Sequence, residues 1–252
     1  MANIKVSVIN ASKALTDDQV SAAVPALQTQ VHRDFAPAWG TDADLSFVPT
    51  GGTPAAGSWW LVILDNSDQA GALGYHDLTN EGLPLGKVFA GSDIQMGYQW
   101  TVTASHELLE MLGDPDVNLT VFVQPDSSKG TLYAYEVADA CEADEFGYSI
   151  NGTLVTDFVF PAWFESFRAS GSTRFDYQNK IQQPLQLLAG GYIGAFDIAS
   201  GAGWHQISAQ GSPFKYEMRP RLGSRRERRR TPRNHWLKSE VRQQPHIQAA
   251  AR

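Results

Sequence analysis

Short apolar runs separated by turn residues predict several strands in the first ninety positions of the chain. Ile4, Val6 and Val8 repeat every second residue, as in a strand with one buried face. The segment 59–65 opens with six consecutive apolar residues, which is typical of a strand buried on both faces. Turns rich in Gly, Pro and Asn separate these segments from two further strand-like stretches, 45–48 and 87–90.

A helix is predicted after the first strand. Apolar residues recur every three or four positions over 20–35, which is the period of a helix with one buried face. Thr16 and Gln19 have the spacing of a capping box, so the helix should begin just after Thr16. Pro25 lies inside this segment and lacks a backbone donor, so we expect it to bend or interrupt the helix.

A second helix is predicted near residues 99–112, and extended segments follow it. The helix should end at Gly113 as its C-cap, and 132–141 reads as extended. An Asn-Gly pair predicts a hairpin within 148–160. The glycines of 190–194 do not follow a strand with phosphate-loop spacing and are assigned to turns. Helices and strands that do not alternate regularly predict an α+β fold rather than a doubly wound sheet.

Charge divides the chain into two parts. Residues 215–252 contain 12 Lys and Arg against three acidic residues, whereas 1–214 contains 8 basic and 24 acidic residues, so the net charges are +9 and −16. The basic segment has too few apolar residues to offset its ordering entropy. We therefore expect a folded domain over 1–214 and a disordered or loosely docked basic tail over 215–252. Nucleic acid could bind only through this tail, and a solvated tail or one folded back on the acidic domain is the simpler interpretation.

Several classes of protein are excluded by composition. Cys141 is the only cysteine, so neither a disulfide framework nor a cysteine-based zinc knuckle can form within one chain. No apolar run approaches the roughly 20 residues that span a bilayer, so we expect no membrane association. The first residues lack the basic and apolar regions of a secretory leader. The expected location is the cytoplasm, or outside the cell by leaderless export.

Candidate chemistry concentrates on the second predicted helix. His106 and Glu110 are one helical turn apart, so their side chains leave the same face and can reach one ion. Glu107 lies beside them, where the H-E-x-x-H motif of metalloproteases places the glutamate that takes a proton from metal-bound water. The alternative is an ordinary amphipathic helix that buries its leucines and leaves His106 and Glu110 as a solvated pair.

A second acidic cluster follows about 30 residues later. Glu136, Asp139 and Glu142 lie among apolar and aromatic residues, where buried carboxylates would be costly without a cation or hydrogen-bond donors. Basic side chains are scarce in 1–214, so a metal ion is a plausible cation. The alternative is that this cluster forms a solvated loop.

The two motifs together resemble a known family. Ser-His-Glu-x-x-Glu followed by Asp-Pro, and then Glu-x-x-Asp-x-Cys, is similar to a zincin-like group of bacterial and fungal proteins with an H-E-x-x-E core. The resemblance is specific over 104–116 and 135–142 and loose elsewhere. It implies a zincin-like fold, a mixed β-sheet packed on helices with an active-site helix near 99–112, and metallopeptidase activity on a peptide or protein substrate.

The resemblance also implies roles for individual residues. His106 and Glu110 would be metal ligands, Glu107 the general base and Glu136 the third ligand. Asp139 would be a further ligand or an acceptor that orients His106.

Asp116 is an alternative third ligand. Its spacing from the motif matches the metzincin signature, in which Gly113 would turn the chain so that residue 116 faces the metal. That family also needs a Met-turn, for which Met218 is a poor candidate, so Glu136 is preferred.

The presence of Glu110 in place of the second histidine should alter the Lewis acidity and the identity of the bound ion. A His/Glu/Glu set donates more negative charge, which weakens the Lewis acid and raises the pKa of its bound water. Zinc is the first choice, and Mn²⁺, Mg²⁺ or Ca²⁺ become more competitive because carboxylate oxygen suits them.

The sequence leaves open the roles of two further histidines. His76 and His205 could approach the site, although a lone histidine near aromatic residues usually has a structural role.

A second functional hypothesis is a non-catalytic binding protein, a degenerate zincin, in which the metal stabilises the fold and an acidic surface engages a basic partner.

Overall fold

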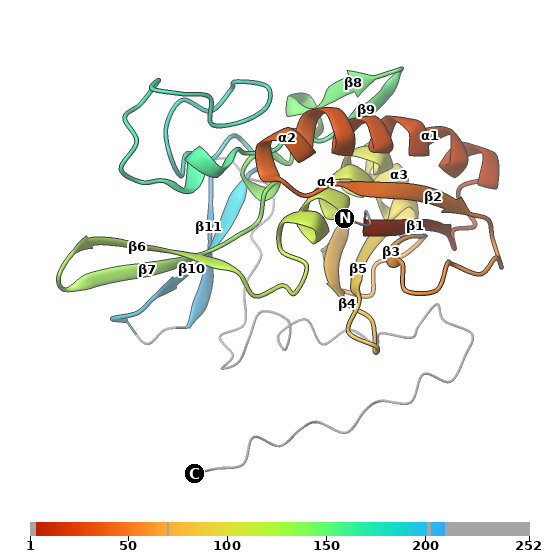
Figure 1. The fold of residues 1–252 in the computed structure, drawn as a ribbon, viewed down its shortest axis with the longest axis horizontal. Helices are drawn as coiled ribbons and strands as arrows, with labels where there is room; N and C mark the ends of the chain where they lie inside the picture. The colour runs from red at the N-terminus through yellow and green to blue at the C-terminus, as the bar shows by residue number, and fades with distance from the viewer. Residues whose placement is uncertain (1–3, 70, 201–202, 210–252) are drawn as a thin grey trace, which may run out of the picture.

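A mixed five-stranded sheet forms one half of the protein in the computed structural model, which describes residues 4–69, 71–200 and 203–209 (Figure 1). Its order is β2-β1-β3-β5-β4. The first four of these strands run parallel, and β4 at the edge runs antiparallel to β5. The bounds are β1 Ile4–Asn10, β2 Ala43–Val48, β3 Trp59–Leu64, β4 Gly74–Leu78 and β5 Pro84–Phe89.

Four of these strands, β1, β2, β3 and β5, were predicted, as was the burial of the apolar strand β3 on both faces. In β3, Leu61, Val62 and Ile63 are fully buried because Leu61 and Ile63 pack in the main core on one face and Val62 packs in a smaller apolar cluster on the other. The strand β4 was not predicted, and its partner β5 begins three residues earlier than expected.

The first predicted helix is confirmed, and Pro25 does not interrupt it. Helix α1 spans Asp17–Thr29, and Thr16 and Gln19 form both hydrogen bonds of the capping box. The helix continues through Pro25 and changes to a π-helical turn at Gln30–Phe35 before α2, Ala36–Trp39. Buried apolar side chains of this segment join the main core, and this packing outweighs the loss of one backbone donor.

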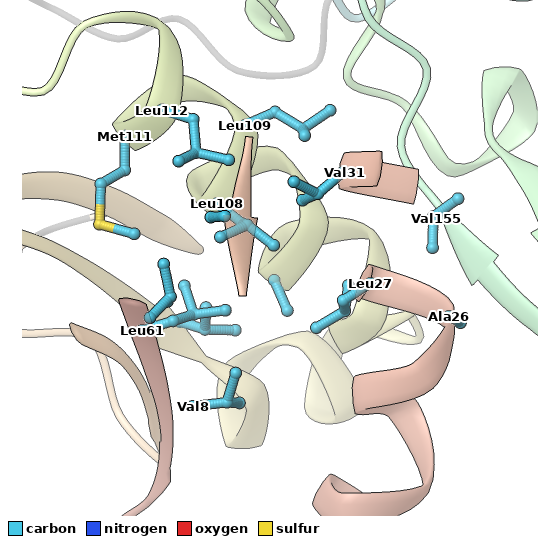
Figure 2. Close-up of a cluster of buried hydrophobic side chains, with 14 of the residues drawn as sticks. Val8, Ala26, Leu27, Val31, Leu61, Leu108, Leu109, Met111, Leu112 and Val155 are labelled. Carbon is cyan, nitrogen blue, oxygen red and sulfur yellow. The ribbon is translucent and has the colours of Figure 1, made fainter. Parts of the chain in front are cut away.

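Helix α4, Trp100–Gly113, packs on the five-stranded sheet together with α1. It follows the short helix α3, Ala90–Met96. Figure 2 shows how side chains of α4, α1 and the sheet meet in the main core, among them Leu27, Leu61 and Leu108. Because α4 also contacts β9, its apolar face is enclosed from several directions.

The expected C-cap at Gly113 is wrong by one residue. Gly113 is the last helical residue, the cap is Asp114, and no left-handed turn occurs at Gly113. A Cβ atom at this glycine would lie 2.9 Å from Cγ1 of Val137. The glycine therefore allows the segment before the second acidic cluster to approach the end of α4.

A second, antiparallel sheet lies beside the first in Figure 1, with the order β11-β10-β7-β6. Its strands are β6 Thr120–Asp126, β7 Lys129–Ala134, β10 Tyr192–Asp197 and β11 Trp204–Ser208. Two predictions are corrected here. The extended segment expected over 132–141 ends at Ala134 and is followed by a 3-10 turn at Asp139–Cys141, and most of 190–194 lies in β10 rather than in turns.

The predicted hairpin is confirmed in shorter form as β8, Tyr148–Ile150, and β9, Thr153–Val155. Asn151 and Gly152 at its tip have φ values of 51° and 85°, as expected for an Asn-Gly turn. Two further 3-10 turns are Asp144–Phe146 and Pro161–Phe164.

The α+β class is confirmed by this arrangement of helices and separate sheets. Within the described ranges, no helix has the length and apolar character needed to cross a membrane. The predicted end of the folded domain at residue 214 lies outside the described residues, as does the basic segment 215–252 with Met218.

Candidate metal centre

The helix that carries the motif is buried on nearly all sides. His106, Glu107 and Glu110 are 7%, 4% and 2% exposed, although they lie on a helix whose leucines are also buried. The alternative of a solvated pair on an amphipathic helix is therefore wrong. Burying these polar side chains would be unfavourable unless they have partners of opposite charge or an ion.

Hydrogen bonds fix the rotation of α4 about its axis. The backbone N–H of Thr156 donates to Oγ of Ser105 at 2.7 Å, and Oγ1 of Thr101 donates to the carbonyl of Leu154 at 2.6 Å. On the side of α3, Oγ1 of Thr103 donates to Oδ1 of Asp93 at 3.0 Å. These contacts hold the motif residues toward the second acidic cluster and β4.

The second acidic cluster packs against the motif. Glu136 and Asp139 are 4% and 5% exposed, so the alternative of a solvated loop is wrong. Oδ1 of Asp139 lies 3.2 Å from Nε2 of His106, and Oε2 of Glu110 lies 3.3 Å from the same nitrogen. The backbone N–H of Ala138 donates to Oε1 of Glu110 at 3.3 Å. The turn after Glu136 therefore supplies both a carboxylate and a backbone donor to the helix residues.

His76 also belongs to the site, which differs from the structural role that the sequence favoured. It is fully buried on β4, with Nδ1 3.5 Å from Oε2 of Glu110 and Nε2 3.6 Å from Oε2 of Glu136. In the antiparallel register His76 lies opposite Gly86, whose missing side chain faces Glu107 on α4. A hairpin pattern around residues 79–83 could have indicated this strand and hence the face that His76 occupies.

The candidate ligands form two sets that share Glu110. One set is His76, Glu110 and Glu136, and the other is His106, Glu110 and Asp139. In each set the ligand atoms lie within 4.8 Å of one another. The alternative ligand Asp116 is exposed and belongs to neither set, and His205 on β11 is also exposed.

Two glycines of the sheet make room for Glu107. A Cβ at Gly74 would lie 2.6 Å from Oε1 of Glu107, and a Cβ at Gly86 would lie 3.5 Å from its Cβ. The other carboxylate oxygen, Oε2, is buried without a hydrogen-bond partner and lies 3.8 Å from Nδ1 of His76. Glu107 is therefore confined between α4 and β4 with one oxygen directed toward His76.

Burial and mutual charge displace the pKa values at the site. Burial alone would lower the pKa of His106, but the charge of Glu110 and the hydrogen bonds that His106 donates to Asp139 and Glu110 raise it well above its usual value. Burial would raise the pKa of Glu110, but His106 and His76 lower it well below its usual value. Burial and the charge of Glu110 raise the pKa of Asp139 to about 7. Glu110 is thus the anionic centre of the cluster.

Tyr192 is a further site residue that the sequence did not indicate. Its side chain is hydrogen-bonded to Asp139, and burial together with the charge of Asp139 raises its pKa well above the usual value. It is therefore a neutral donor at neutral pH. Because it lies on β10, its proximity depends on the placement of the second sheet, which the glycine-rich pattern around it obscured.

Comparisons of the chain with protein-family models, with curated proteins and with solved structures find no match. Imidazole nitrogens and carboxylate oxygens in one buried cluster form a donor set that suits a divalent ion such as Zn²⁺ or Mn²⁺.

Proposed function

We propose that the protein is a metal-dependent hydrolase that acts on peptide bonds, with an ion held by His106, Glu110 and Asp139. The main support is the spacing of the ligand atoms. Nε2 of His106 lies 3.2 and 3.3 Å from its two carboxylate oxygens. Bond lengths of about 2.0–2.2 Å around a tetrahedral zinc ion place neighbouring ligand atoms about 3.4 Å apart. The side chains therefore fit such an ion with little movement.

The third ligand in this proposal is Asp139 rather than Glu136 or Asp116. Asp139 contacts His106 directly, whereas Glu136 contacts His76, and Asp116 is exposed. One imidazole and two carboxylates favour zinc first, with Mn²⁺, Mg²⁺ and Ca²⁺ as competitors.

Glu107 is proposed as the general base. It is held beside the ligand set by α4, β4 and β5, and its Oε2 has no hydrogen-bond partner that would occupy it. When bound, the ion would polarise a carbonyl and lower the pKa of a water molecule. Glu107 would then accept the proton of the attacking water, and the neutral hydroxyl of Tyr192 is a candidate donor to the developing oxyanion.

The proposal of a peptide substrate rests on the zincin resemblance, which implies a mixed sheet lying over an active-site helix. The packing of α4 on the five-stranded sheet is consistent with that expectation. Metal binding and peptide cleavage are measured separately in the test.

The test compares wild-type protein with Glu107→Gln. Each is freed of metal, reloaded with zinc or manganese, and screened against a fluorogenic peptide library. We expect the wild type to cleave a subset of peptides, and the Glu107→Gln protein to lose about a hundredfold or more in rate while keeping its metal content.

Exposed Asp116→Asn is the matched control and should keep both activity and metal. Equal rates for wild type and Glu107→Gln would remove the base role. Bound metal with no cleavage by the wild type would favour the non-catalytic binding protein.

A further inference from the structure

The two ligand sets define two ion positions rather than one. Among the described residues, neither set of mutually close ligand atoms includes both histidines. Oε2 of Glu110 lies 3.5 Å from Nδ1 of His76 and 3.3 Å from Nε2 of His106, so one oxygen faces both. Its second oxygen accepts the backbone N–H of Ala138. Glu110 is therefore the point at which the two sets join.

The charge of the cluster can also accommodate a second cation. Glu107, Glu110, Glu136 and Asp139 are each no more than 5% exposed, and two histidines accompany them. If the carboxylates are ionised, the six side chains carry two negative charges even with both imidazoles protonated. One divalent ion with neutral histidines leaves the same excess, whereas two divalent ions neutralise the four carboxylates. Uncompensated charge is costly at this depth of burial.

We propose that the site is dinuclear, with a second divalent cation held by His76, Glu110 and Glu136 and with Glu110 shared between the two ions. One ligand atom from each of these residues lies within 4.8 Å of the others. Nδ1 of His76 is 3.5 Å from Oε2 of Glu110, and its Nε2 is 3.6 Å from Oε2 of Glu136. Its ligands come from β4, α4 and the segment after β7.

A catalytic role for the second ion rests on the proposed hydrolase function. In two-metal sites, which include those of aminopeptidases, the ions lie about 3.5–4 Å apart and would act together on the attacking water and the scissile carbonyl. Oε2 of Glu107 is 3.8 Å from Nδ1 of His76, so the proposed base lies beside the second position as well. The metal site itself is tested without reference to hydrolysis.

The experiment measures metal stoichiometry and coupling on the full chain. Metal-free protein is saturated with Mn²⁺ or Zn²⁺, desalted and analysed for metal content. We expect about two ions per wild-type chain, about one for His76→Ala and for the isosteric Glu136→Gln, and about one for His106→Ala. Glu110→Gln should bind neither ion tightly because it removes the shared ligand. Asp116→Asn is the control and should keep two.

Electron paramagnetic resonance of the Mn²⁺ protein tests the shared ligand. Two ions that share Glu110 should give an exchange-coupled spectrum in the wild type and an isolated-ion spectrum in Glu136→Gln. Circular dichroism of each variant identifies any that fail to fold, and Glu136→Gln replaces His76→Ala if the fully buried histidine is essential for folding.

The proposal is overturned if the saturated wild type holds one ion, if Glu136→Gln keeps the wild-type stoichiometry, or if two ions are bound without coupling. These outcomes are distinct from failure of the proposed function. One bound ion with peptide cleavage would refute the second site alone, and two coupled ions without any cleavage would refute hydrolysis alone.

Discussion

The substitution Gly74→Ala tests whether the position of Glu107 matters while every proposed ligand stays intact. The new methyl carbon would lie 2.6 Å from Oε1 and 2.7 Å from Cγ of Glu107, and 2.9 Å from the carbonyl oxygen of Lys87. Ordinary contact begins at 3.4 Å. The Lys87 oxygen belongs to the paired strand β5, so the flexible carboxylate should move, by about 0.8 Å or more.

A displacement of about 1 Å in a positioned catalytic group can cost about a hundredfold in rate. We therefore expect Gly74→Ala to lower kcat by about that factor, to keep its metal content, and to lose about 1–3 kcal/mol of unfolding free energy through overpacking. Cleavage of the peptide selected by the library, metal analysis and urea unfolding measure the three effects.

The control is Gly130→Ala in the second sheet. Its methyl carbon would lie an equally close 2.6 Å from Cε2 of Phe122, a half-exposed side chain that can swing away. This variant should keep full activity. Wild-type kcat in a folded Gly74→Ala protein would refute the idea that the packing of Glu107 against β4 sets its catalytic position.

Three further predictions concern stability. Leu108→Ala should cost about 2–5 kcal/mol in urea unfolding because Leu108 is fully buried in the main core, whereas half-exposed Phe122→Ala should cost far less; equal losses would contradict the packing described. Burial and Asp176 raise the pKa of Asp157 to about 9, so unfolding free energy should fall as pH rises from about 4 toward 9, because the unfolded state releases this proton first. Asp157→Asn should flatten that decline, and parallel pH curves would refute the assignment. Zinc at about a hundredfold over its Kd should add about 2.7 kcal/mol and raise Tm by about 5–10 °C, reversibly with chelator. A similar shift in Glu110→Gln, which lacks the ligand shared by both ion positions, would show that the zinc binds elsewhere.

Local patterns account for the parts of the fold that the sequence predicted. The capping box at Thr16, the period of α4 and the Asn-Gly hairpin each depend on residues within a few positions of one another. The one-turn spacing of His106 and Glu110 is equally local, so their placement on one face of a helix could be predicted from the motif alone.

Residues that depend on pairing between distant segments were missed. The strand β4 is five residues long and contains His76 and Asp77, so its hydrophobic pattern is weak. Only its pairing with β5 determines that His76 faces α4. Tyr192 reaches Asp139 because β10 adds to β7 across nearly sixty intervening residues, and no local pattern specifies that pairing.

The burial of α4 predicts which segments of the protein unfold locally and which exchange their amide hydrogens only on global unfolding. Helices enclosed by a core exchange their backbone amide hydrogens chiefly through global unfolding, whereas peripheral segments open locally at much lower free energy. The amides of α4 from Ala104 onward should therefore be among the slowest to exchange in the chain. Movement of α4 would disrupt the main core, whereas movement of the second sheet would leave that core in place, so we expect access to the site from the side of the second sheet. Inhibitors that trap such an open form would accordingly speed exchange in the second sheet and leave the exchange of the helix unchanged.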